Sequence, residues 1–320
     1  MTAVGGTGPA RPRFVAPMPG IHDGARAWRD GLRRIEDLGF DEVAVSEHYT
    51  QGWAMEPLTA LAFAAAATSR LRFVTLVLNN DLRHPALVAK AFATADVLSE
   101  GRVTLGLGAG WMPADYQALG VPFDAAGTRV ARLEEALGVV ASFFAGGAVT
   151  ASGAFYHVDG LEALPPVVQR PRPPILVGAG GPRMLDVAGR LADVVGLHVT
   201  LGPGGFDERA AREMSRASIE AKIARVQAAA QSAGRPTPAF ELTPVLVVVD
   251  GARSTAARSG FTDYVESHAE EFADSPAVLV GSAREVARSV ERWHDELGIA
   301  LWHLGADVGA AGRVVAAVDG

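Results

Sequence analysis

The chain contains no cysteine and almost no lysine. Without cysteine it cannot form disulfides, zinc–thiolate sites or a thiol nucleophile. Only two of its 29 basic residues are lysines, Lys90 and Lys222. Both fall in helical patterns, which disfavours an enzyme that forms a Schiff base with a lysine on a strand. No apolar run approaches the ~18 residues that suggest a transmembrane helix, and the first residues show no hydrophobic signal core.

Clustered basic residues and metal-ligand spacings are also missing. The formal net charge is −7, so a nucleic-acid partner is not expected. Eight histidines are scattered along the chain without the spacing of paired ligands, and we expect no metal site. About half of the residues (49%) are hydrophobic and 20% are charged, as in ordinary globular proteins. We therefore expect a cytoplasmic protein with a small-molecule substrate and no membrane or nucleic-acid partner.

What the chain does have is a regular alternation of β-branched runs and helical patterns. Several of the runs are apolar throughout, as expected for parallel strands buried on both faces. Eight alternations favour a (β/α)8 TIM barrel over a doubly wound sheet, and we expect one domain over residues 1–320. The predicted strands are 13–17, 42–47, 72–78, 103–108, 174–179, 194–199, 242–249 and 300–304. The predicted helices are 28–38, 57–68, 85–98, 128–144, 183–192, 208–233 and 283–297.

Two segments interrupt the alternation and are predicted to be insertions. Residues 145–174 contain AVTASGAFYHV, which favours a β-hairpin turning at Ser152–Gly153, followed by a proline-rich return. Residues 250–278 form a long excursion with a helix around FTDYVESHAEEF. Long loops in a compact domain are often lids or specificity elements.

Polar side chains follow the second and third predicted strands. The SEHY sequence, Ser46 to Tyr49, puts a carboxylate beside an imidazole, which suits acid–base chemistry at the carboxyl end of a barrel strand. The same residues could simply satisfy backbone groups at a helix entry. After the third strand, Asn79–Asp81 and Arg83–Pro85 are good turn and helix-start chemistry. For Asp81 and His84 we favour that structural interpretation.

Two glycine-rich turns follow later strands. In GLGAGW, Gly106 to Trp111, the spacing differs from the G-x-G-x-x-G of dinucleotide-binding folds. In GAGGPRM, Gly178 to Met184, backbone N–H groups at a helix start could hold a phosphate, although an ordinary βα turn would read the same. His198 and His303 end the sixth and eighth strands, so either could face the mouth of the barrel.

Taken together, these segments resemble the bacterial luciferase-like superfamily over nearly the whole chain. The resemblance is carried by RHPALVAKAFATADVLSEGRVTLGLGAGWMPADYQALGVPFDAAGTRVARLEEAL and by the later blocks PPILVGAGGPRMLDVAGRLADVVGL and VLVGSAREVARSVERW. TLVLNNDLRHP together with GLGAGWMPADY is most similar to the actinobacterial branch that uses the deazaflavin coenzyme F420. The resemblance implies a TIM barrel that binds a flavin or deazaflavin at the carboxyl ends of its strands.

The resemblance also assigns roles to residues. It implies a non-proline cis peptide in a bulge within Thr75–Leu78, at Leu76–Val77, behind the cofactor ring. Relatives usually carry aspartate where this chain has Glu47. The implied catalytic residues are His48 and Glu47. The implied cofactor-binding residues are Ser46, Thr75, Leu76, Val77, Gly108, Gly110, Gly178, Ala179, Gly180 and Gly181. The implied substrate-lining residues are Trp53, Trp111 and His198.

Sugar-phosphate-oxidising relatives carry a glutamate where this chain has Trp111, and they hold phosphate with lysines that this chain lacks. We therefore expect an uncharged or aromatic substrate. The resemblance implies an oxidoreductase that transfers a hydride between coenzyme F420 and this substrate, as a homodimer. The alternatives are an FMN-dependent monooxygenase of the same fold and a flavin-binding protein without turnover.

Overall fold

A computed structural model describes residues 11–50, 52, 55–201, 207–254 and 260–319. The described residues divide into two compact units. Unit 1 comprises residues 45–177, and unit 2 comprises residues 11–44 and 178–319. Within these ranges, no helix is both long and apolar enough to cross a membrane.

The main sheet is a parallel barrel, as predicted. Pairing of β3 with both β2 and β5 closes the strand order β3-β2-β1-β14-β10-β9-β8-β5 into a ring, with β4 alongside β5. This confirms the (β/α)8 fold. The strands are β1 (Arg13–Pro17), β2 (Glu42–Val45), β3 (Arg72–Thr75), β4 (Leu78–Asn79), β5 (Val103–Gly108), β8 (Ile175–Ala179), β9 (Val194–Leu197), β10 (Ala239–Leu242) and β14 (Ile299–His303).

The seventh barrel strand lies earlier than predicted. The strand expected at 242–249 is two strands: β10 ends at Leu242, and β11 (Leu246–Val249) begins after Pro244. Proline has no N–H for a sheet ladder, so it separates the two. β11 leaves the barrel and joins a three-stranded sheet with β12 (Ala252–Arg253) and β13 (Val278–Gly281). The valine-rich run is thus buried, but outside the barrel.

Most helices lie where the sequence predicts them, because their starts are marked by caps and prolines. Glu56, which precedes Pro57, accepts hydrogen bonds from the N–H groups of Leu58 and Thr59. Ser282 and Glu285 form a capping box. The segment 208–233 contains two helices, not one. The helices are α1 (Gly24–Asp37), α2 (Pro57–Ala67), α3 (Pro85–Leu98), α4 (Pro113–Leu119), α5 (Ala126–Ala145), α6 (Pro182–Leu191), α7 (Glu208–Arg212), α8 (Arg216–Ser232), α11 (Ala283–Leu297) and α12 (Val308–Asp319).

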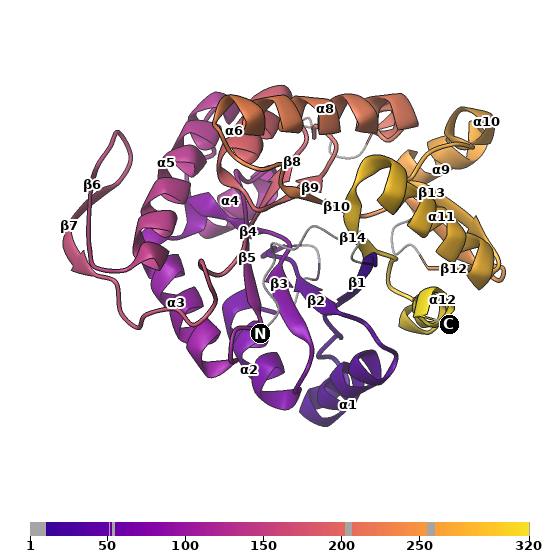
Figure 1. The fold of residues 1–320 in the computed structure, drawn as a ribbon, viewed down its shortest axis with the longest axis horizontal. Helices are drawn as coiled ribbons and strands as arrows, with labels where there is room; N and C mark the ends of the chain where they lie inside the picture. Colours follow the sequence, from indigo (N-terminus) through magenta and orange to yellow (C-terminus); the bar gives the residue numbers. More distant parts are fainter. Residues whose placement is uncertain (1–10, 51, 53–54, 202–206, 255–259, 320) are drawn as a thin grey trace. The chain divides into compact units, whose positions relative to one another are not determined.

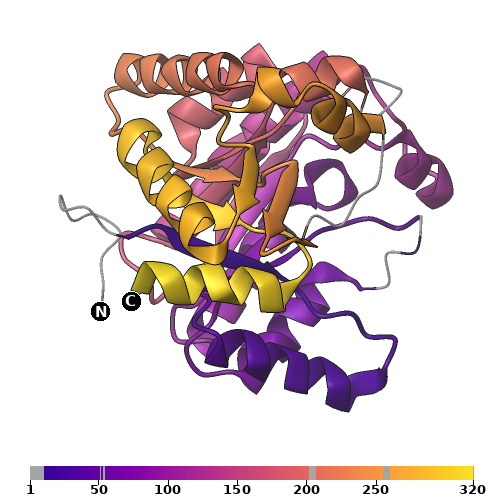
Figure 2. The ribbon, with the colours of Figure 1, turned by 90° about the vertical axis from the view of Figure 1, so that its right-hand side faces the viewer.

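Both predicted insertions contain the expected elements. In unit 1, β6 (Ala148–Ser152) and β7 (His157–Glu162) form a hairpin that extends outward from α5 (Figure 1). Its turn is held by the Glu135 side chain, which accepts backbone N–H groups of residues 154–156. In unit 2, the excursion carries α9 (Gly260–Ser267) and α10 (Ala269–Phe272). Figure 2 shows α11 and α12, in yellow, side by side in the same unit.

Candidate active site

The third barrel strand, β3, lies in unit 1 and is interrupted at the predicted place, before β4. The peptide bond between Leu76 and Val77 is cis, as expected from the family resemblance. Ser46 Oγ donates a hydrogen bond to the Leu76 carbonyl, at 3.0 Å. Leu76 and Val77 are partly exposed, whereas Thr75 and Leu78 on either side are buried. The break therefore presents a short apolar wall after β3.

The glycines of the GLGAGW turn are required by contacts inside the protein. A Cβ on Gly106 would lie 1.7 Å from the Thr75 carbonyl oxygen, and one on Gly108 would lie 2.7 Å from Val77 Cγ2. Gly110 has a φ of +73°, and a Cβ there would meet Tyr116 Oη at 2.0 Å. Close backbone packing explains all three residues. Binding of a cofactor by Gly108 and Gly110 remains a prediction.

His48 is held by a carboxylate that sequence inspection did not single out. His48 Nδ1 and Asp115 Oδ2 are 2.7 Å apart. The other oxygen of Asp115 accepts from Thr50 Oγ1 at 2.7 Å and from the Tyr49 N–H at 3.1 Å. Burial would raise the pKa of Asp115, but these hydrogen bonds outweigh it and lower the pKa. Asp115 is therefore an anion that holds His48 in place through Nδ1.

Trp111 lies beside His48, as expected for two residues of one site. Their rings meet edge to face, with centroids 5.6 Å apart and an interplanar angle of 82°. The His48 side chain keeps 15% of its surface exposed, so a ligand can reach it. Trp53, the other predicted substrate residue of this unit, lies outside the described residues.

Glu47 is enclosed and engaged on both oxygens. Oε1 accepts hydrogen bonds from Tyr49 Oη at 2.9 Å and from Arg83 at 2.5 Å, and Oε2 accepts the Asn79 N–H at 2.8 Å. Arg83 continues to Glu56 at 2.8 Å. Burial alone would lower the pKa of Arg83, but its anionic neighbours raise it. This geometry favours an anchoring role for Glu47, which ties the loop after β2 to the loop after β4.

The turn after β4 has the structural roles favoured from the sequence. The Asn79 side chain accepts the Asp81 N–H at 3.1 Å, and Asp81 is ion-paired with Arg132 at 2.8 Å. His84 Nδ1 accepts the Ala86 N–H at 3.2 Å, which makes His84 the N-cap of α3. Asp81 and His84 therefore complete turns and a helix start.

In unit 2, the GAGGPRM turn joins β8 to α6. Gly181 is the N-cap of α6 and has no side chain that could cap the helix start. A Cβ on Gly180 would lie 2.3 Å from the Val199 carbonyl oxygen, so the backbone can come this close only at glycine. Gly178 and Gly180 are partly exposed, and Ala179 is buried. The turn can present N–H groups to an anion.

His198, at the end of β9, is a neutral imidazole at physiological pH. Burial, reinforced by the charge of Lys222, lowers its pKa to about 4. Lys222 Nζ donates to the His198 carbonyl at 2.6 Å and pairs with Glu213 at 2.9 Å. The ammonium group of Lys222 therefore binds groups of the protein itself.

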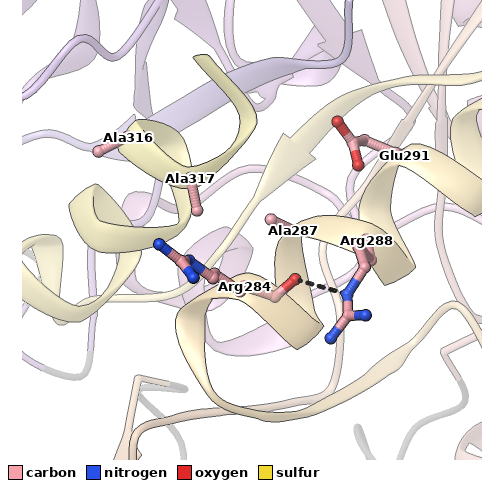
Figure 3. Close-up of a pocket in the computed structure, with 6 residues that line it drawn as sticks. All are labelled: Arg284, Ala287, Arg288, Glu291, Ala316 and Ala317. Atoms are coloured by element: carbon pink, nitrogen blue, oxygen red, sulfur yellow. Dashed lines mark hydrogen bonds between the residues drawn. The ribbon is translucent and has the colours of Figure 1, made fainter. Parts of the chain in front are cut away.

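A pocket in unit 2 lies between α11 and α12 and has a volume of about 600 Å³ (Figure 3). None of the predicted site residues lines it. Its lining residues are Arg284, Ala287, Arg288, Glu291, Ala316 and Ala317. In the part of the chain that the structure describes, no three His, Asp or Glu side chains are grouped so that they could hold a metal ion.

Comparison with protein families identifies the fold group. The model of the family described as luciferase-like monooxygenase matches residues 10–318. The chain belongs to this family. The family resemblance inferred from the sequence motifs is thereby confirmed.

Two relatives have F420 in their names. The chain is 39% identical over 177 residues to the F420-dependent glucose-6-phosphate dehydrogenase of Beutenbergia cavernae, covering 53% of this chain and 51% of that protein. It is 31% identical over 296 residues to the F420-dependent hydroxymycolic acid dehydrogenase of Mycobacterium tuberculosis (strain ATCC 25618 / H37Rv), covering 89% and 74%. The chain thus spans about half the length of the glucose-6-phosphate dehydrogenase.

A solved structure supports the fold alone. The coenzyme F420-dependent tetrahydromethanopterin reductase of Methanopyrus kandleri is similar with a TM-score of 0.72 and 18% identity. The match covers 96% of this chain and 98% of that chain. It therefore agrees with the barrel found in the main sheet.

Proposed function

We propose that the protein is an oxidoreductase that transfers a hydride between coenzyme F420 and a small organic substrate. The observation that carries the proposal is the Asp115–His48 pair beside Trp111 in unit 1. A carboxylate that orients a partly exposed imidazole suits it to acid–base chemistry on a bound substrate. The names of the two F420-dependent relatives support this choice of cofactor.

The residues present fit such a cofactor. In unit 1, Leu76 and Val77 form a partly exposed apolar wall suited to a flat ring, with Ser46 and Thr75 fixing its backbone. In unit 2, the start of α6 at Gly181, whose N-cap has no side chain, suits a phosphate. The bound deazaflavin would supply the hydride-accepting and hydride-donating centre. His48 would hold or release the proton of the substrate oxygen, and Asp115 would orient His48.

We propose an uncharged or aromatic substrate. Trp111 supplies an aromatic edge next to His48. Of the two lysines, Lys222 is paired with Glu213 and Lys90 lies exposed on α3, where it follows no barrel strand. Neither suits the binding of a substrate phosphate. We expect the substrate to differ from a sugar phosphate, despite the name of the Beutenbergia relative.

The alternative is an FMN-dependent monooxygenase, which the family description favours. Titration of the purified protein with FMN and with F420, followed by fluorescence, separates the two proposals. We expect F420 to bind and FMN to bind weakly or not at all. Tight FMN binding without F420 binding would refute the first proposal.

His48 provides the test of catalysis. We expect His48→Ala to bind F420 with an unchanged Kd but to lose roughly 10²–10⁴-fold in the rate of hydride transfer, the usual range for a general acid–base residue. The control is His84→Ala, which removes a helix cap and leaves His48 in place. An unchanged rate in His48→Ala would point to a binding protein without turnover, or to a proton donor other than His48.

We also propose that two copies associate through the outer surfaces of α2 and α3. These helices expose apolar side chains: Phe63 is 68% exposed, Leu87 is 67% exposed and Leu98 is 80% exposed. Large apolar side chains on two successive helices mark an interaction surface. Such an apolar patch suits a second copy of the same face, because a symmetric dimer is self-complementary. A cytoplasmic location is part of the same proposal.

Sedimentation measures this association directly. We expect the wild type to be a dimer and Phe63→Asp with Leu87→Glu to be a folded monomer. Val280→Glu changes an equally exposed apolar residue (58%) in unit 2 and should remain dimeric. A dimeric double variant would show that α2 and α3 are not the interface.

A further inference from the structure

Glu241 is a buried carboxyl group that the proposed hydride transfer does not yet use. It lies on β10 and is 1% exposed. Oε1 accepts a hydrogen bond from Thr243 Oγ1 at 2.9 Å. Among the described residues, Oε2 has no hydrogen-bond partner. Buried polar atoms are nearly always satisfied by protein or by water, so this oxygen requires an explanation.

The oxygen points to the space over Gly196. A Cβ built on Gly196 would lie 3.1 Å from Glu241 Oε2 and 3.2 Å from His198 Nε2. The carboxyl oxygen and the imidazole nitrogen therefore approach the same point from two strands. They lie close enough for one water molecule to accept from one and donate to the other. The absence of a side chain at residue 196 leaves the room for it.

The charges around this point keep both groups neutral. Burial, reinforced by the charge of Glu42, raises the pKa of Glu241 to about 7. Burial and Lys222 lower the pKa of His198 to about 4. Glu42 is itself paired with Arg13 at 2.8 Å, and Lys222 with Glu213. His303 on neighbouring β14 is half-buried and neutral, since burial of its imidazole lowers the pKa to about 4. Below pH 7 the proton of this group of side chains therefore rests on Glu241.

We propose that Glu241, one water molecule over Gly196 and His198 form a buried proton-exchange site in unit 2. In the forward step the Glu241 Oε2–H bond breaks and the His198 Nε2–H bond forms through the water, while the His198 Nδ1–H bond breaks and its proton passes to solvent water at the partly exposed imidazole. Glu241 is left as a carboxylate and His198 stays neutral. The reverse step reloads Glu241. The use of this proton in the reaction rests on the proposed function, because hydride transfer to a carbonyl also needs a proton. The existence of the exchange site does not depend on the proposed function.

Infrared spectroscopy over a pH series tests where the proton rests. We expect a carboxylic-acid band that disappears near pH 7 in the wild type and is absent in Glu241→Gln. Glu42→Gln removes another buried carboxyl of the same unit and should keep the band, with a midpoint at lower pH because the charge that helps to raise the pKa of Glu241 is gone. Persistence of the band in Glu241→Gln, or its absence from the wild type at pH 6, would overturn the assignment.

Nitrogen NMR of His198 tests the connection across Gly196. In the wild type we expect the His198 Nε2 resonance to shift with the Glu241 midpoint, and to be constant over the same pH range in Glu241→Gln. Gly196→Ala keeps both titrating groups but fills the water position, so the shift should shrink severalfold. Gly138→Ala, in open space on α5, is the control and should behave as the wild type. Equal shifts in Gly196→Ala and the wild type would overturn the bridge.

These two measurements need no substrate and no cofactor, so they stand even if neither F420 nor FMN binds. If hydride transfer is found, we expect its pH profile to lose the limb near pH 7 in Glu241→Gln while the Kd for F420 is unchanged. An identical pH profile in the variant and the wild type would overturn the role of the site in the reaction.

Discussion

Asp115→Asn is the substitution that bears most directly on the candidate active site. The side chain keeps its size and shape, but the carboxylate that holds His48 becomes a neutral amide. Asp115 is 4% exposed and receives three hydrogen bonds, from His48, Thr50 and the Tyr49 backbone. An amide has one acceptor oxygen, so it cannot replace the carboxylate in all three.

The expected loss follows from the strength of the His48–Asp115 contact. At 2.7 Å it is a charge-assisted hydrogen bond, and hydrogen bonds to charged groups contribute about 1.5–3 kcal/mol. If this contact orients His48 in the transition state, its loss lowers the rate by roughly 10- to 100-fold, since each 1.4 kcal/mol or so is about tenfold.

The assay is single-turnover hydride transfer as a function of pH, with the Kd for F420 measured separately. Asp81→Asn is the matched control, because Asp81 is also a buried, ion-paired carboxylate of unit 1. It should lower stability without moving the pH profile. If Asp115→Asn lowered stability as Asp81→Asn does, but left the rate and the pH profile as in the wild type, the orienting role of Asp115 would be refuted.

Two further predictions concern stability. The pKa of Glu241 rises from 4.5 to about 7 on folding, so the folded state holds its proton more tightly and the wild type loses stability as pH rises between these values. Urea unfolding at pH 4 and pH 8 should show a loss in the free energy of unfolding that is about 3 kcal/mol larger for the wild type than for Glu241→Gln, and equal changes in both proteins would contradict this prediction. Gly106→Ala should lower the free energy of unfolding by about 3 kcal/mol or prevent folding, because its Cβ would meet backbone atoms that cannot rotate away; Gly138→Ala should raise it by up to about 1 kcal/mol. Similar melting temperatures for these two variants would refute the packing argument.

The sequence predicts the barrel well because its local signals agree with its global fold. Prolines and capping residues mark helix starts at Pro57, Pro85 and Ser282, and apolar runs mark strands buried on both faces. The predicted position of the seventh strand is wrong for a physical reason: LTPVLVVV would be apolar in the barrel and in a neighbouring sheet alike. Only Pro244 signals the break, and it does not say which half belongs to the barrel.

The residues of the candidate site likewise divide into those that the sequence predicts and those that it does not. The cis peptide, His48 and Trp111 follow from motifs close to strand ends. Asp115 lies within the quoted GLGAGWMPADY motif, four residues after Trp111, but nothing in the sequence shows that it reaches back to His48. Glu241 is not predicted, because the expected strand begins at residue 242, whereas β10 begins at Ala239. Contacts between residues 67 positions apart, as between His48 and Asp115, are set by tertiary packing.

The small sheet of unit 2 has a consequence for how this protein can change. β11 pairs in parallel with β13, and β12 turns back along β11, so the three strands satisfy one another's backbone groups without the barrel. The segment between β12 and β13 is nonetheless packed: Val265 and Phe272 are buried, and Ser275 donates a hydrogen bond to the Met214 carbonyl. Directed evolution or loop grafting can therefore vary the exposed positions of this segment, but must keep these buried ones for unit 2 to stay stable.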